Sequence, residues 1–260
     1  MAGRPMIFIP LSDDNPLRHV PYQWVTVGLI GVNVAIFAWQ FIGIGPSPAA
    51  SFALVPSELF QAGLLGGPAY GRYDTIAVPE SLTLLTYMFF HADIFHLSTN
   101  MLFLWVFGDN VEDALGHIRF LVFYVACGVA GGLAHAWIGA GSWVPLVGAS
   151  GAVAGVIAAY LLLHPGVRVW VLVLRVIPVR MTAVWILGVW AVSQVFMLLF
   201  GRGDQIAWSA HVGGMVAGAL LVVVLRRRGV PLLDGGIVLL DQPDWAGAWR
   251  AVPSRPSELP

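Results

Sequence analysis

Three short groups of polar residues interrupt apolar stretches of this sequence, and their types are those of nucleophilic catalysis. The first holds His96 and Asn100, the second is Gly-Ala-Ser150-Gly, and the third holds His211 in Ala-His-Val-Gly-Gly. A serine beside a histidine is a nucleophile beside its general base. Histidine and asparagine side chains can donate hydrogen bonds to an oxyanion. This chemistry requires Ser150 and His211 to meet in the fold.

The surrounding composition is that of a polytopic membrane protein. Of the 260 residues, 58% are hydrophobic and 10% are charged, and the mean hydropathy is +0.80. Soluble globular proteins contain about 45–50% apolar and about 25% charged residues. This chain has too few polar residues to cover the surface of a soluble fold. The single cysteine, Cys127, excludes an intramolecular disulfide, and the net charge of −1 gives no support to nucleic-acid binding. The sequence therefore predicts an all-α membrane protein.

Six apolar segments predict the membrane helices. A spanning helix needs about 20 mostly apolar residues. The segments are residues 23–44, 94–114, 118–138, 150–163, 180–199 and 207–225, of which the fourth is short. They divide the chain into a cytoplasmic N-terminal segment (1–22), a six-helix membrane domain (23–225) and a poorly ordered cytoplasmic tail (226–260).

The arginines predict the orientation of these helices. The sequence holds no lysine, so all 13 basic residues are arginines. With the N-terminus inside, eleven of them lie in inner segments, and only Arg72 and Arg202 lie outside. Positive charge collects on the cytoplasmic side, so we expect a protein of the inner cell membrane with both termini in the cytoplasm. Residues 167–177 carry Arg168 and Arg175 and are expected to form a cytoplasmic interfacial segment rather than a seventh span.

Two connections bear on the site. Residues 45–82 form a long first loop that we expect to lie partly in the outer membrane interface. Residues 139–149 are broken by glycine and proline and lead into the short fourth helix, which rises only about 21 Å. Its start must therefore lie below the outer surface, where non-helical backbone is tolerated only beside protein or water. The six helices are thus expected to enclose a polar cavity that opens outward.

The polar groups lie at the predicted outer ends of the second, fourth and sixth helices, and glycines indicate that these ends meet. Small residues four apart let membrane helices approach closely. The same face of the sixth helix carries His211 and its glycine pair, so close packing would bring His211 to Ser150. The glycine pairs are Gly151 with Gly155 on the fourth helix and Gly214 with Gly218 on the sixth.

Taken together, these motifs resemble the signatures of the rhomboid family of intramembrane serine proteases. Each motif alone is common by chance, but three in this order, each at its helix position, are specific. The resemblance covers about residues 23–225. It rests on Gly148-Ala-Ser150-Gly, His96-x-x-x-Asn100 and Ala-His211-x-x-Gly214-x-x-x-Gly218, with His91 ahead of the pair and Gly108-Asp-Asn-Val-Glu112 at the inner end of the second helix.

The resemblance implies a serine endopeptidase that hydrolyses a peptide bond in or beside a transmembrane helix of a membrane-protein substrate. Ser150 would be the nucleophile and His211 the general base and acid of a Ser–His dyad, with no cofactor and no metal. The lipid bilayer and the substrate would be the partners, nucleic acid would not, and the oligomeric state stays open. The oxyanion would be held by His96, Asn100 and the Ser150 backbone N–H, while helix packing or the cavity wall would involve His91, Gly148, Gly151, Gly155, Gly214 and Gly218.

Other functions stay open beside the protease. A rhomboid-like binding protein without protease activity would share the fold, although the intact Ser150 and His211 argue against it. A metal-dependent protein or transporter could use the histidines, but a zinc site wants a further firm ligand, usually Cys or a carboxylate. Taken singly, Ser150 is a typical helix N-cap, and His96 with Asn100 is a typical interhelical hydrogen-bond pair.

Three features depart from the family pattern. The first loop carries no Trp-Arg pair of the kind some bacterial members have, and Arg72 is its only basic residue. Thr99 replaces a bulky residue of some relatives and predicts a wider substrate entrance. Ala154 stands where some members place an aromatic ring against the catalytic histidine, which leaves the orientation of His211 open.

Overall fold

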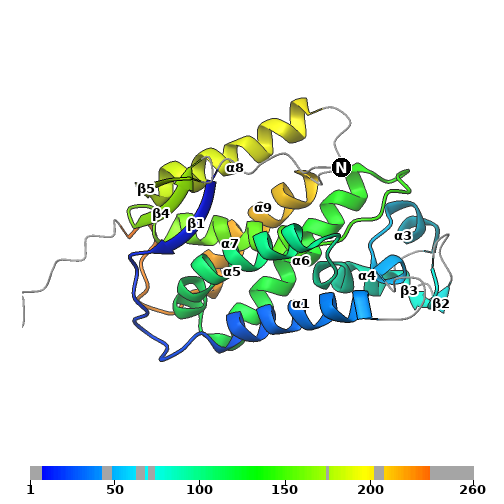
Figure 1. Ribbon diagram of the computed structural model, residues 1–260, viewed down its shortest axis with the longest axis horizontal. Helices are drawn as coiled ribbons and strands as arrows, with labels where there is room; N and C mark the ends of the chain where they lie inside the picture. Colours follow the sequence, from blue (N-terminus) through cyan, green and yellow to red (C-terminus); the bar gives the residue numbers. More distant parts are fainter. Residues whose placement is uncertain are drawn as a thin grey trace, which may run out of the picture.

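The computed structural model describes residues 8–42, 49–62, 68–69, 74–173, 176–201 and 208–234. Six long helices form most of this part of the chain (Figure 1). Each of them matches a predicted segment to within three residues at either end. They are α1 (Trp24–Ile42), α5 (Ile94–Leu115), α6 (His117–Ile138), α7 (Ser150–Leu163), α8 (Ala183–Phe200) and α9 (Trp208–Leu225).

Within the described ranges, four of these helices are long and apolar enough to cross a membrane by length and composition. They are α1, α6, α8 and α9, whereas α7 is a shorter apolar helix. Helix α5 lies outside this set and carries Asp109, Glu112 and Asp113 in its last two turns. The fold is therefore mostly helical with at least four candidate spans, and the count of six crossings stays a prediction.

The limits of α5 follow from the residues at its two ends. The Asp93 side chain accepts a hydrogen bond from the His96 backbone N–H at 2.8 Å and caps the first turn. Gly116 ends the helix with a φ of 87°, a conformation that residues with a Cβ rarely adopt. Helix α6 starts at the next residue, so Gly116 alone connects the two helices.

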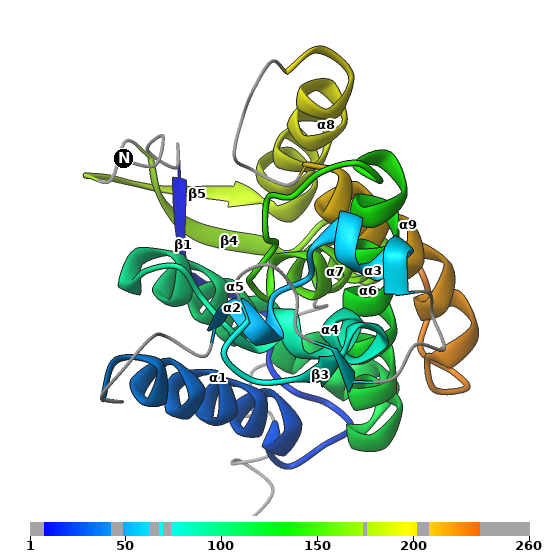
Figure 2. The same cartoon turned by 90° about the vertical axis from the view of Figure 1, so that its right-hand side faces the viewer.

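Helix α7 is the central element of the fold. It packs against α5, α6, α8 and α9, and ten of its 14 residues are buried. By contrast, only Ala183, Ile186, Leu187 and Gln194 are buried among the 18 residues of α8, all of which are described. Figure 2 shows α8 at the edge of the bundle. The start of α7, at Ser150, is therefore surrounded by other helices.

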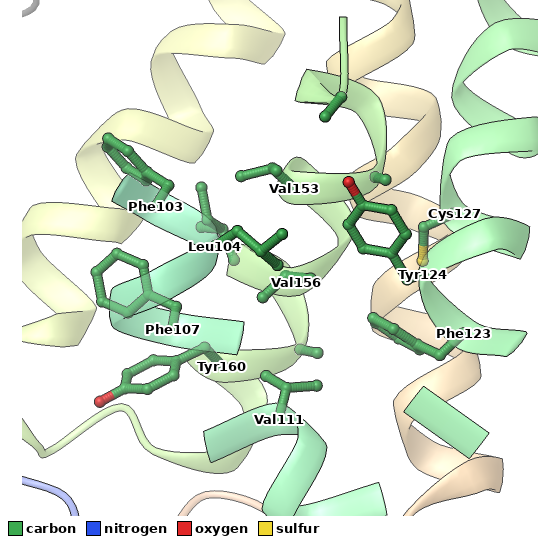
Figure 3. Close-up of a cluster of buried hydrophobic side chains, with 14 of the residues drawn as sticks. Phe103, Leu104, Phe107, Val111, Phe123, Tyr124, Cys127, Val153, Val156 and Tyr160 are labelled. Atoms are coloured by element: carbon green, nitrogen blue, oxygen red, sulfur yellow. The ribbon is translucent and has the colours of Figure 1, made fainter. Parts of the chain in front are cut away.

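Large side chains fill the space between α5, α6 and α7 (Figure 3). Tyr160 of α7 lies edge-on to Phe107 of α5, with ring centroids 4.9 Å apart. Such interdigitation holds the helices in one arrangement, because close contacts must replace the hydrophobic driving force inside lipid. The figure labels Phe103, Leu104, Phe107, Val111, Phe123, Tyr124, Cys127, Val153, Val156 and Tyr160.

A three-stranded antiparallel sheet corrects the all-α prediction. It consists of β1 (Phe8–Asp13), β4 (Arg168–Val173) and β5 (Ile177–Thr182), in the order β1-β4-β5. Residues 167–177 are thus largely strand, their interfacial position stays a prediction, and α8 starts at Ala183 instead of Arg180. The sequence from Arg168 to Val171 alternates in a way typical of a strand. In the structure Val169 and Val171 are buried, while Arg168 and Trp170 are exposed.

Two adjacent acids of α5 hold the N-terminal segment. The Asp113 carboxylate accepts hydrogen bonds from the backbone N–H groups of Arg18, His19 and Val20 at 2.6–3.0 Å. Glu112, which is fully buried, accepts from the Thr26 N–H and hydroxyl at 2.8 and 2.7 Å, at the start of α1. The segment before α1 is therefore tied to the bundle.

The described parts of the first loop and of the tail are also docked on the bundle. The described part of the connection from α1 to α5, which includes this loop, contains α2 (Ala49–Phe52), α3 (Pro56–Ala62), the strand pair β2 (Pro68–Ala69) and β3 (Val78–Pro79), α4 (Glu80–Thr86) and the turn η1 (Tyr87–Phe89). After α9, the Leu233 and Asp234 N–H groups donate to the carbonyls of Leu162 and Leu163 at the end of α7. Most of the predicted tail, residues 235–260, lies outside the described residues.

Candidate active site

Ser150 and His211 meet between α7 and α9. Ser150 is the first residue of α7, and His211 lies in the first turn of α9. The His211 Nε2 atom lies 2.9 Å from the Ser150 Oγ atom. The backbone before Ser150 is held in place, because Gly148 has a φ of 122° and its N–H donates to the Tyr87 carbonyl at 2.9 Å. The two residues are therefore placed as a nucleophile and a base must be.

Glycines set the separation of α7 and α9. A Cβ added at Gly214 would collide with the carbonyl oxygen of Gly151, and one added at Gly218 would collide with that of Gly155. The two backbones are thus in direct contact over two successive turns, as small residues permit in membrane helices. This contact sets the distance between Ser150 and His211.

The opposite side of the His211 ring contacts α8. The Nδ1 atom lies 2.8 Å from the Oε1 atom of Gln194, whose side chain is buried. The rings of Trp190 and Trp208 lie 6.1 and 6.0 Å from the imidazole, centroid to centroid. Sequence reasoning missed all three residues. The signal for Gln194 was available, since polar side chains inside apolar helices are costly and rarely idle.

His96 lies against the segment that leads into Ser150. A Cβ at Gly148 would be 2.7 Å from the His96 Nε2 atom, so the imidazole packs directly on the glycine backbone. Asn100 is buried one turn further along α5, and its Nδ2 atom donates to the His96 carbonyl at 2.9 Å. One amide hydrogen of Asn100 is thus used inside its own helix, which leaves the other for a ligand.

His91 supports the same segment from the loop before α5. Its ring is fully buried, its Nε2 atom accepts the Ala149 N–H at 3.4 Å, and it lies 5.1 Å from the His96 ring. Burial lowers the pKa of His91 to about 3, which keeps Nε2 free to accept. The His91 backbone is in turn held by the Gln40 side chain at 3.1 and 3.2 Å.

Acidic side chains are absent from the described contacts of His211. Asp109, Glu112 and Asp113 lie at the other end of α5, where the last two hold the N-terminal segment. Among the described residues, no group of three or more His, Cys, Asp or Glu side chains could hold a metal ion. Ala154 is fully buried and offers no ring to His211. The His211 ring is therefore oriented by an amide and two indoles.

Comparisons with known proteins bear on the six-helix region. The model of the Rhomboid domain family matches residues 79–228. Rhomboid protein 1, mitochondrial, of Saccharomyces cerevisiae is 28% identical over 228 residues, which are 84% of this chain and 58% of that protein. Rhomboid protease GluP of Bacillus subtilis is 33% identical over 162 residues, 60% of this chain and 29% of that protein.

A third relative matches over most of both chains. Rhomboid protease AarA of Providencia stuartii is 26% identical over 225 residues, 76% of this chain and 71% of that protein. For the yeast and Bacillus proteins, the match spans less than two thirds of the relative's own length. The family match itself covers more than half of this chain and includes all three polar groups. The chain belongs to the rhomboid family.

Proposed function

We propose that the protein is an intramembrane serine protease that uses Ser150 and His211 as a catalytic dyad. The observation that carries this proposal is the 2.9 Å contact between His211 Nε2 and Ser150 Oγ, made between two helices of a rhomboid domain. Two of the relatives carry the word protease in their names. A non-catalytic binding protein would have no need for this pair.

The reaction follows from the geometry of the pair. The Ser150 hydroxyl attacks the scissile carbonyl while His211 Nε2 takes its proton, and the same proton is then given to the leaving amine. The Ser150 N–H is at the start of α7, where the first backbone donors have no partner within the helix. Together with His96 and the second Asn100 amide hydrogen, it is suited to hold the oxyanion. Water entering from the outer face then releases the acyl-enzyme.

The substrate is expected to be a membrane protein whose helix unwinds near the site. A peptide carbonyl in an intact helix is hydrogen-bonded and hidden from the nucleophile. Segments rich in glycine or other weak helix formers near the membrane surface should therefore be cleaved in preference. We place the protein in a cell membrane as a multi-pass protein, with both termini on the cytoplasmic side.

A fluorophosphonate probe tests the proposal, because it reacts covalently with an activated serine. The parent protein should be labelled and should cleave a single-span model substrate with glycines near its outer end. Ser150→Ala should lose both activities while its melting temperature stays near that of the parent, since it removes only one hydroxyl and its hydrogen bond to His211, which contributes about 0.5–1.5 kcal/mol. Ser98→Ala, at an exposed serine of α5, is the matched control and should keep both. Labelling that persists in Ser150→Ala would refute the assignment.

A further inference from the structure

The orientation of the Gln194 side-chain amide is determined by its own helix. Its Nε2 atom donates to the Trp190 carbonyl at 3.2 Å and to the Ser193 hydroxyl oxygen at 3.0 Å. The Ser193 hydroxyl hydrogen is already donated to the same Trp190 carbonyl at 2.6 Å. A carbonyl oxygen can only accept, so a flipped amide would place two acceptors against each other. The Oε1 atom must therefore face away from α8, toward His211.

The amide orientation decides which nitrogen of His211 carries the proton. Gln194 Oε1 can only accept, so at 2.8 Å it requires a hydrogen on His211 Nδ1. A neutral imidazole has one N–H, and the Nε2 atom is then left with a lone pair. That lone pair faces the Ser150 hydroxyl at 2.9 Å. This tautomer is the one a general base for Ser150 needs.

We propose that Gln194 is a positioning residue that selects the Nδ1–H tautomer of His211 and holds its ring toward Ser150. The inference rests on the proposed protease function and adds to it a third member from α8. Gln194 is 4% exposed and is the only polar side chain among the four buried ones of α8, all of whose residues are described. A buried amide whose hydrogen bonds are satisfied costs far less than a buried carboxylate.

The same arrangement explains how His211 is held without an aromatic ring at position 154. Trp190 contributes the carbonyl that orients Gln194 and also the indole that lies 6.1 Å from the imidazole. Trp208 closes the other side with its ring nearly perpendicular, at 86°. Gln194 then restricts rotation of the imidazole within this frame, because only one ring orientation satisfies both Oε1 and Ser150 Oγ.

Two substitutions at Gln194 distinguish the loss of the hydrogen-bond acceptor from a change in side-chain volume. Gln194→Met keeps the length and removes the acceptor, and we expect kcat to fall by about 10–100-fold, part of the about 10²–10⁴ that a general base supplies. KM should stay within about twofold, because the substrate does not touch this group. The rate of fluorophosphonate labelling of Ser150 should fall together with kcat. Val195→Met, at the exposed neighbouring position, is the control and should match the parent.

Gln194→Glu is the conservative variant and should recover most of the lost rate. In its protonated form, a carboxylic acid has the same pattern as the amide: its hydroxyl donates to the Trp190 carbonyl and its other oxygen accepts from Nδ1. If Gln194 had only a structural role, the kcat of each variant would instead follow its melting temperature and not the presence of a hydrogen-bond acceptor at position 194. Equal kcat in the parent and Gln194→Met would overturn the proposal, as would a Gln194→Glu variant no better than Gln194→Met.

The tautomer can be observed directly in protein labelled with ¹⁵N-histidine, with the His211 signals assigned by their loss in His211→Gln. The parent should show a protonated Nδ1 and an unprotonated Nε2 on His211. Gln194→Met should show a mixture of the two neutral tautomers. A protonated Nε2 in the parent would overturn the proposal. If the parent neither labels nor cleaves, the protease function itself fails; if it does both and Gln194→Met is unchanged, only this inference fails.

Discussion

Gly214 of α9 lies directly on the carbonyl group of Gly151 of α7, with no room for a Cβ atom between them. The contact is one residue from Ser150 on one helix and three residues from His211 on the other. The position of the nucleophile relative to its base is therefore set by backbone against backbone. No flexible side chain takes part in this contact, so the structure has little capacity to accommodate a larger residue there.

Gly214→Ala should consequently inactivate the protein. An added Cβ forces α7 and α9 apart, and overpacking of this kind costs about 1–3 kcal/mol. We expect a lower melting temperature and a loss of cleavage of about 10²-fold or more. Gly188→Ala on α8 is the matched control: its Cβ would meet nothing within 4 Å, and alanine favours a helix over glycine by about 1 kcal/mol. A Gly214→Ala variant that melts and cleaves like the parent would show that the contact is not decisive.

His96→Ala and Asn100→Ala test the proposed oxyanion site. Removal of one donor to a transition-state oxyanion lowers kcat by about 10²–10³ and leaves KM nearly unchanged. If both residues hold the same oxygen, the double variant should fall by less than the product of the single effects. Melting curves serve as the control, since Asn100 also donates to the His96 carbonyl. Normal cleavage with early melting would make the pair structural.

Asp13→Asn tests a half-buried acid at the end of β1. Burial raises the pKa of Asp13 from 3.8 to about 6 in the folded protein, although Tyr160 donates to it and opposes the shift. The folded state therefore binds the proton more tightly than the unfolded state. The contribution of Asp13 to stability is therefore fully present below about pH 4, is lost as the pH rises from about 4 to 6, and stays absent above that range.

Asparagine cannot ionise, and its Oδ1 can still accept from Tyr160. We therefore expect Asp13→Asn to melt above the parent at pH 7.5, by an amount equivalent to about 1 kcal/mol after allowance for solvent screening, and close to the parent at pH 4. The control is Asp14→Asn, which removes an exposed ion pair with Arg180 and should not raise the melting temperature. A parent that is more stable at pH 7.5 than at pH 4 through Asp13 would contradict the assignment.

The segment before α1 and the last described residue, Asp234, lie on one side of the bundle. Arg18 and Asp234 form an ion pair at 3.4 Å, and the Arg227 N–H donates to the Ala114 carbonyl at the end of α5. The shared location of the two terminal segments and the excess of arginine on that side predict that both termini are cytoplasmic. A reporter that works only in the cytoplasm should be active when fused before Met1 or after Pro260, and a reporter that works only outside should be inactive at both ends. Activity of either fusion on the outer side would reverse the topology.

The helices were predictable because each is a long apolar run bounded by glycine, proline or charge. The sheet was not, although strand-period alternation is visible in residues 168–173. The reason is distance along the chain: Phe8 pairs with Val173, and no local pattern in a short N-terminal segment names a partner so far away. The start of α8 was misplaced for a local reason: residues 177–182 continue its apolar run but form β5, in which Arg180 pairs with Trp170.

By itself, the sequence determined which residues have the chemistry and which helices carry them: Ser150, His211, His96 and Asn100 are recognisable because polar side chains inside apolar helices are expensive. Only the tertiary structure decided how they meet. The 2.9 Å between Ser150 and His211 follows from the approach of two glycine-faced backbones. The contact of Gln194 with His211 exists because α8 packs beside α9 at one rotation about its axis. A linear pattern shows which face of a helix is polar, whereas the partner of that face depends on the packing of the whole bundle.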